Sequence, residues 1–196
     1  MKKNKGFTLI ELLAVIVILG VLLAIAIPAV SKYINTAKKS TYKENVQSYA
    51  KAAKNEFMNI GSSYQLPVER GDATVVTFKE LEYAIENGGK KSSYGKEFKA
   101  DNSCVIIVND GTTNDPHYTY YIAAMDEKGY SIGKDNATKV IAYDKIEEKN
   151  IIQTSGAGIA CKTITSISTD IEAEYTDNFK VKRLFDKEGT LLGSAS

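Results

Sequence analysis

The sequence has no tryptophan, one histidine and two cysteines among its 196 residues, and its formal net charge is +1. One histidine, His117, without a second histidine or a plausible cysteine partner, indicates neither a zinc site nor an assisted nucleophile. A net charge near zero provides no global basic field for nucleic acid. We find no catalytic constellation. Residue content therefore predicts neither an enzyme nor a resident cofactor.

Length and composition set further bounds. A chain of 196 residues is long enough for one globular domain plus an extra element, and short for two domains. The first six residues contain Lys2, Lys3 and Lys5 and no acidic residue. Lysine, asparagine, isoleucine and tyrosine are abundant. We associate this bias with low-GC Gram-positive bacteria, and it favours such a source.

The most informative segment is the apolar run from Phe7 to Val30, in which Glu11 is the only charged residue. A helix rises 1.5 Å per residue, so about 20 apolar residues cross the hydrocarbon core of a bilayer. The run is long enough to do so. Because Lys2, Lys3 and Lys5 lie on its N-terminal side, the positive-inside rule predicts a cytoplasmic N-terminus and places the rest of the chain outside.

Two ordinary explanations of this run are available. A secretory signal peptide has an apolar centre of about 7–15 residues. This run is longer, although Ala24-Ile25-Ala26 could serve as a small-residue cleavage site. A plain membrane anchor fits the length but gives no reason for Glu11. A carboxylate at that depth in lipid is costly, and it indicates a functional site.

The segment Lys5 to Leu12, KGFTLIEL, supplies a more specific explanation. It closely resembles the prepilin leader junction of type IV pilins and pilin-like proteins. The resemblance implies that a membrane peptidase cuts after Gly6 and methylates the new N-terminal residue, Phe7. It also implies that Glu11 meets the amine of a neighbouring subunit and sets the register of assembly. In apolar surroundings either charge alone would be costly, and the pair less so.

Gly20 and Pro28 interrupt the helix that this run predicts. Pro28 lacks an amide hydrogen and crowds the carbonyl of Ala24, so we expect a kink or a loosened turn there. In filaments of the pilin family, the region between the matching glycine and proline often loses helical structure. That makes both residues candidates for a role in assembly. The alternative is a harmless kink, which membrane helices tolerate.

After Pro28, apolar residues recur with mostly helical spacing and predict an amphipathic helix that continues to about Ile60. The stripe consists of Val30, Tyr33, Ile34, Ala37, Tyr42, Val46, Tyr49, Ala50, Ala53, Phe57 and Ile60. We expect Gly61-Ser62-Ser63 to end it. The first half of such a helix has only lipid or other helices to pack on, and the second half has a head. This is the lollipop that the resemblance to pilins also implies.

The remaining residues predict a globular head. Thr77 and Glu80 form a capping box that opens a short helix, which Gly88-Gly89 should stop. Runs bounded by turn residues predict strands at 104–108, 118–125, 130–132, 138–143, 179–185 and 190–192. Gly129 should adopt the left-handed conformation in the turn of a hairpin. Consecutive short strands with tight turns favour an antiparallel sheet.

The predicted fold class is therefore α+β: a long kinked N-terminal helix packed on an antiparallel β-sheet head. The expected organisation is a cleaved leader at residues 1–6, a transmembrane and filament-core helix at 7–30, an amphipathic helix at 31–60 and a head at 61–196. The resemblance to pilins is strong over about the first 60 residues and rests on architecture alone over the head.

Two features of the head are candidates for chemistry. Cys104 and Cys161 could form a disulfide, because the head is expected outside the membrane, where disulfides persist. Two free thiols are the alternative. Asp110, Asn114 and Asp115 place oxygen ligands in one loop, a weak calcium candidate of the kind known in some pilin-like proteins. Because the spacing matches no EF-hand and these are common turn residues, an ordinary turn is preferred.

Two surface features have simple explanations. The lysines on the 30–60 helix could attract DNA phosphates, but a solvated helix face is preferred, and we expect no nucleic-acid partner. Tyr118, Tyr120 and Tyr121 could line a ligand-binding patch, but packing in the sheet is preferred.

The sequence as a whole predicts a structural subunit of a type IV pilus, used for adhesion, motility or surface attachment. The alternatives are a pseudopilin or competence pilin of a secretion or DNA-uptake machine, and a membrane-anchored extracellular binding module. The resemblance implies as partners copies of the same chain in a helical filament, the prepilin peptidase, and an assembly platform with its ATPase. It also implies a precursor in the cytoplasmic membrane, in contact with lipid, and a mature protein in an extracellular pilus.

Overall fold

The computed structural model describes residues 6–59, 66–86, 89–161, 166–167, 179–180, 183–185 and 191–194. The chain divides into two compact units, Met1–Lys38 and Lys39–Ser196, and the division falls inside the long helix α1, Leu9–Met58. Helix α1 confirms the helix predicted from Phe7 to about Ile60, within two residues at each end. The domain boundaries expected from the sequence remain predictions.

In the unit Met1–Lys38, helix α1 buries no large apolar side chain against any part of the chain that the structure describes. Every large apolar side chain from Leu9 to Ile34 is exposed. The helix is long and apolar enough to cross a membrane. Apolar surface left in water costs about 25 cal/mol per Å², so this half of α1 requires lipid or other helices around it.

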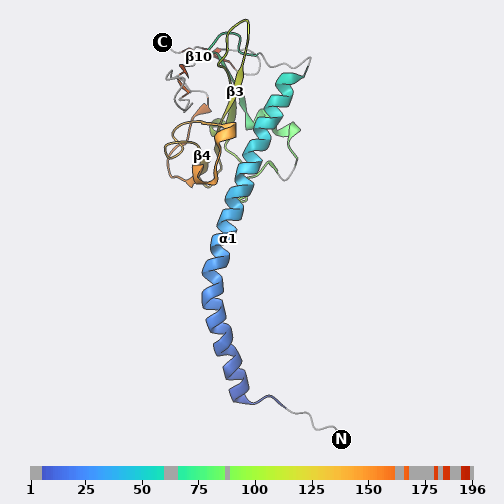
Figure 1. Cartoon of the computed structure of the whole chain (residues 1–196), viewed down its shortest axis with the longest axis vertical. Coiled ribbons are helices and arrows are strands. Elements are labelled where there is room, and N and C mark those ends of the chain that lie inside the picture. The colour runs from blue at the N-terminus through green and yellow to red at the C-terminus, as the bar shows by residue number, and fades with distance from the viewer. Residues whose placement is uncertain are drawn as a thin grey trace. The chain divides into compact units, whose positions relative to one another are not determined.

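In the unit Lys39–Ser196, the same helix runs beside the sheet (Figure 1), and one side of it is buried. Its buried residues are Tyr42, Val46, Tyr49, Ala50, Ala52, Ala53 and Phe57. These positions recur at helical spacing and form one face, which packs in a single core with Val105 and Ile107 of the sheet. The predicted apolar stripe is therefore buried only from Tyr42 onward, because Val30, Tyr33 and Ile34 are exposed.

The sheet follows α1 and is antiparallel except for one pair. Its strands are β1 (Ala73–Thr77), β2 (Cys104–Asn109), β3 (Tyr118–Met125), β4 (Tyr130–Ile132), β5 (Ile141–Ala142), β6 (Ile151–Gln153), β9 (Arg183–Phe185) and β10 (Leu191–Ser194). Among the described residues the order is β10-β9-β1-β2-β3-β4-β6, and β5 pairs with β3. Strands β1 and β9 are parallel, and β7 (Ser166–Ile167) and β8 (Phe179–Lys180) form a separate pair. The predicted α+β fold class is confirmed.

The centre of the sheet shows what the sequence analysis found and missed. The run from Cys104 becomes β2 and is buried throughout. Strand β2 pairs along its length with β3 on one side and with β1 on the other. No strand was predicted at Ala73–Thr77, although in this β1 segment Ala73 is followed by four β-branched residues. The signal was short and ran directly into the cap of the next helix.

The hairpin of β3 and β4 is confirmed. Gly129 has a φ of +82°, and a Cβ there would lie 2.4 Å from the carbonyl oxygen of Thr154, so the turn requires glycine. The fully buried Asp126 organises the same turn. Its carboxylate accepts hydrogen bonds from the backbone amides of Lys128 and Tyr130, both at 2.9 Å, and from the hydroxyl of Ser92.

Three predictions of local secondary structure are either wrong or fall partly outside the residues that the structure describes. The strand expected at 138–143 is wrong over most of its length, because residues 135–138 form a turn and Tyr143–Lys145 a 3₁₀ turn (η4), which leaves only β5. Strands β9 and β10 pair antiparallel as the second predicted hairpin requires, but their connecting turn lies outside the described residues. So do Ile60 and the predicted helix stop at residues 61–63.

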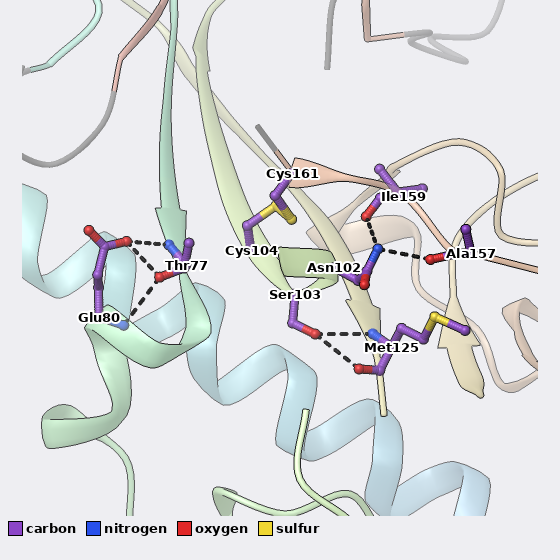
Figure 2. Close-up of a disulfide and its surroundings, with 9 residues drawn as sticks. All are labelled: Thr77, Glu80, Asn102, Ser103, Cys104, Met125, Ala157, Ile159 and Cys161. Atoms are coloured by element: carbon purple, nitrogen blue, oxygen red, sulfur yellow. Dashed lines mark hydrogen bonds between the residues drawn. A yellow bond between two sulfur atoms is a disulfide. The ribbon is translucent and has the colours of Figure 1, made fainter. Parts of the chain in front are cut away.

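The short helix α2, Phe78–Leu81, begins at the predicted capping box (Figure 2). The Thr77 hydroxyl accepts from the amide of Glu80 at 3.3 Å, and the Glu80 carboxylate accepts from the amide and hydroxyl of Thr77, both at 2.7 Å. The helix ends earlier than predicted. A 3₁₀ turn, η1 (Glu82–Ala84), follows, and Ile85 is already extended and buried, well before the expected stop at Gly88-Gly89.

Aromatic rings fill the space between α1 and the sheet. Tyr49 of α1 stacks on Phe78 with ring centroids 3.8 Å apart, and Phe98 meets both rings edge-on. The hydroxyl of Tyr42 donates to the carbonyl oxygen of Tyr130 at 2.8 Å, which joins α1 to β4. Burial raises the pKa of the Tyr42 hydroxyl well above its ordinary value, because the charged form would lose its hydration. The helix face and the sheet are thus joined by apolar contact and by a buried hydrogen bond.

A disulfide joins Cys104 to Cys161 (Figure 2). It belongs to a second apolar cluster, on the face of the sheet opposite to the one that packs on α1. The two Cα atoms are 6.2 Å apart, and both cysteines are fully buried. The side-chain amide of the neighbouring Asn102 donates to the carbonyl oxygens of Ala157 and Ile159 at 3.0 and 2.9 Å. The segment that leads to Cys161 is therefore held to the start of β2 by both covalent and hydrogen bonds. Two further 3₁₀ turns are η3 (Ala100–Asn102) and η5 (Glu148–Asn150).

Replacing both cysteines, Cys104→Ala with Cys161→Ala, should lower the free energy of unfolding by roughly 4 kcal/mol, because a loop of this size is no longer closed in the unfolded chain. Urea unfolding of the full chain in detergent, followed by the near-ultraviolet circular dichroism of tyrosine, measures the change. Ser155→Ala, an exposed position in the same loop, serves as the control and should leave the midpoint unchanged. An unchanged midpoint in the double variant would contradict this role.

Candidate functional site

The residues singled out for processing lie just before α1. Gly6, Phe7 and Thr8 belong to no helix or strand, and the Phe7 side chain is 91% exposed. A Cβ built on Gly6 meets no atom within 4 Å. The Gly6–Phe7 peptide bond is therefore outside the helix and open to another molecule, and no contact within the described chain requires glycine at position 6.

Helix α1 begins with a capping box made by Thr8 and Glu11. The Glu11 carboxylate accepts hydrogen bonds from the backbone amide and the hydroxyl of Thr8, both at 2.8 Å. The Thr8 hydroxyl accepts in turn from the Glu11 amide at 3.3 Å, and the carbonyl oxygen of Thr8 accepts from the amide of Leu12 at 3.2 Å. This reciprocal pattern satisfies amides that the first turn of a helix leaves without partners.

The sequence analysis gave Glu11 an intermolecular role and missed this local one. The signal was present, because T-x-x-E at Thr8 repeats the pattern recognised at Thr77. The local bonds matter because an unpaired carboxylate in an apolar medium is costly. They involve no atom of residues 1–6, so removal of the leader would leave the capping box intact.

Gly20 and Pro28 lie inside α1, and the helix continues through both positions without a break. In the single chain, the helix is therefore not interrupted at Pro28, where we expected a kink or a loosened turn. A Cβ built on Gly20 meets no atom within 4 Å, so no intrachain packing requires glycine there.

In the head, the loop that follows β2 is held together by its own side chains. Both Asp110 oxygens have protein partners: Nδ1 of His117 lies 2.5 Å from Oδ1, and the Thr119 hydroxyl donates to Oδ2 at 2.7 Å. Asp115 contributes its backbone, as its amide donates to the Thr112 hydroxyl and its carbonyl oxygen accepts from the Thr112 amide. The buried Asn109 accepts from the amides of Gly111 and His117.

This geometry favours the turn over the calcium site. Within the described ranges, no group of three acidic, histidine or cysteine side chains comes together to hold a metal. Asp110 is occupied by its neighbours, and Asn114 is exposed in the loop. The side chains of His117 and Thr119 that bind the Asp110 carboxylate hold the loop together. A calcium site would instead require several oxygen ligands that converge on one point.

The tyrosines of β3 belong to the packing of the sheet. Tyr121 is 3% exposed and lies in the cluster around the disulfide, while Tyr118 and Tyr120 pack against the core shared with α1. Burial raises the pKa of all three hydroxyl groups. On α1, Lys51 and Lys54 are exposed on the side opposite the buried face, as expected for a solvated face.

Replacing Thr8 by valine should loosen the first turn of α1, because it removes the hydroxyl that both caps the helix and donates to Glu11. We expect the amide of Glu11 to exchange its hydrogen about fivefold faster, the size expected for loss of one N-cap. Hydrogen exchange followed by NMR on the full chain in micelles measures this rate. Thr8→Ser keeps the hydroxyl and is the control; equal exchange in both variants would show that the capping box is absent.

One comparison with known proteins concerns the same N-terminal segment. The family model described as "Prokaryotic N-terminal methylation motif" matches residues 1–27. The "Type IV major pilin protein PilA" of Myxococcus xanthus (strain DK1622) is 46% identical over 55 residues, which cover 28% of this chain and 25% of that protein. The match thus spans about a quarter of the relative's length. It gives no support for the Gram-positive source that the composition favours.

No solved structure matches the chain. The methylation motif covers Gly6, Phe7 and Glu11, the residues that the structure places before α1 and in its first turn. The chain thus carries the N-terminal methylation motif and is similar, over 55 residues, to a type IV major pilin.

Proposed function

We propose that the chain is a structural subunit of a type IV pilus. The observation that carries the proposal is the half of α1 from Leu9 to Ile34, which exposes all its large apolar side chains and overlaps the methylation motif matched at residues 1–27. A helix that is apolar all round is stable only among lipid or other helices. A membrane supplies the first environment to the precursor, and the core of a filament supplies the second to the mature subunit.

Processing would create the group that Glu11 needs in the filament. Cleavage after Gly6 gives Phe7 a positively charged amine, which methylation by the prepilin peptidase leaves charged. A carboxylate and an amine brought together in an apolar core cost less than either alone. We propose that Glu11 meets the Phe7 amine of a neighbouring copy, with the bonds from Thr8 orienting the carboxylate.

The membrane orientation follows from charge. The lysines that precede Phe7 keep the N-terminus in the cytoplasm, so the unit Lys39–Ser196 lies outside. A filament of identical subunits requires machinery that extracts each one from lipid, and we propose an assembly platform with its ATPase for this step. The open space around Gly20 fits close approach by a neighbouring helix, in which a side chain would intrude.

Removal of the Glu11 carboxylate should separate processing from assembly. We expect Glu11→Ala to be cleaved nearly as well as the wild type but to yield few or no filaments, because the amine of each incoming subunit then has no partner. Electron microscopy and the pilin content of sheared surface fractions measure assembly. Glu44→Ala, an exposed glutamate on the same helix, is the control. Wild-type filament yield from Glu11→Ala would refute the role given to this carboxylate.

The mature N-terminus tests the proposal as a whole. Mass spectrometry of the chain from its own host should find N-methylated Phe7 as the first residue. Gly6→Phe should block cleavage, because a bulky side chain prevents close approach of the peptidase to the backbone, whereas Gly20→Ala should be processed normally. A mature chain that begins near Ile27, or an uncut Met1, would instead support a secreted or membrane-anchored binding module.

A further inference from the structure

A turn between β4 and β5 has an unusual backbone. Asp135, Asn136 and Ala137 have φ angles of 48°, 58° and 60°, and they are the non-glycine residues with positive φ in the described chain. At the base of the turn, the backbones of Lys134 and Lys139 bond to each other in both directions, at 2.9 and 3.2 Å. Three consecutive left-handed residues present a tight turn whose central residue is Asn136.

The turn is anchored on one side and open on the other. Ala137 is 2% exposed and fixes the turn to the head, while Asn136 and Thr138 are exposed. The Thr138 hydroxyl donates to the carbonyl oxygen of Asp135 at 2.7 Å, and the Lys139 ammonium pairs with the Asp135 carboxylate at 2.6 Å. Within the described residues the Asn136 side-chain amide makes no hydrogen bond, so its nitrogen is available to another molecule.

The sequence of this turn, Asn136-Ala137-Thr138, fits the N-x-[ST] pattern of N-glycosylation. No other asparagine in the chain is followed at the second position by serine or threonine. The N-x-[ST] pattern therefore occurs once in the sequence, and it lies in an exposed turn. This is where a bulky, solvated sugar can be attached without disturbing the core.

We propose that Asn136 is a glycosylation site of the exported head. The proposal rests on the proposed function in one respect, the placement of the head outside the cytoplasmic membrane. The donor is an oligosaccharide carried on a lipid diphosphate. Nδ2 of Asn136 bonds to C1 of the first sugar, the bond from C1 to the diphosphate oxygen breaks, the nitrogen loses one proton, and the lipid diphosphate leaves with the electron pair.

Intact mass and tandem mass spectrometry of the mature chain, purified from its own host, tests the proposal. We expect the peptide that contains Asn136 to carry one or more sugar residues on the asparagine. Asn136→Asp, which tolerates the left-handed conformation, and Thr138→Ala should both lose the added mass, and Thr138→Ser should keep it. Asn114→Asp, at an exposed asparagine without the pattern, is the matched control and should keep the modification.

Two results would overturn the proposal: an unmodified Asn136 in the mature chain, or added mass that persists in Thr138→Ala. The same digest reports the N-terminal peptide, so the two proposals can fail separately. A methylated Phe7 with a bare Asn136 would refute glycosylation alone, whereas a chain that begins at Met1 and carries the sugar would refute pilin processing alone.

Discussion

The head depends on burial of one face of α1, from Tyr42 to Phe57, against the antiparallel sheet. The sheet strands that contact this face contribute Val105, Ile107 and Ile122, all fully buried, and the rings of Tyr49 and Phe78 stack between helix and sheet. Without α1, this face of the sheet would be open to water. The helix is therefore as much a part of the head's core as the strands are.

The same helix has opposite requirements in its two halves, and the sequence meets them by different means. After Lys39, apolar residues occupy one face and polar residues the other. From Phe7 to Val30, nearly every residue is apolar and Glu11 is the only charged one. The Thr8 capping box explains how a carboxylate is accommodated there, because the first turn of a helix offers unpaired amides where it begins. Placing the acid at this turn, rather than further along, gives it donors within its own chain.

The sequence predicted the elements that carry strong local signals. Four elements are specified by residues close to one another in sequence: the apolar run, the stripe after Pro28, the capping box at Thr77 and the glycine turn at Gly129. Strand β1 and the turn at Asp135–Ala137 could not be predicted in this way. The first is defined by its pairing with β2, and the second requires left-handed conformations that a non-glycine residue such as Ala137 adopts only when the surrounding structure holds it. At the candidate site, the sequence identified Gly6, Phe7 and Glu11 as candidates but not the partner of the carboxylate in the single chain, although the pattern at Thr8 was readable.

The parallel pairing of β1 with β9 has a consequence for the order of folding. Ala73 is opposite Leu184, so the strands β2 to β6 are all synthesised between the two partners. Contacts between residues far apart in sequence form late, because closing a long loop costs entropy before any contact is gained. Strands β1, β2 and β3 can pair as soon as they are synthesised, and the edge of β1 stays open until β9 arrives. An open strand edge is a template for pairing with another chain, so β9 also protects the head from premature association.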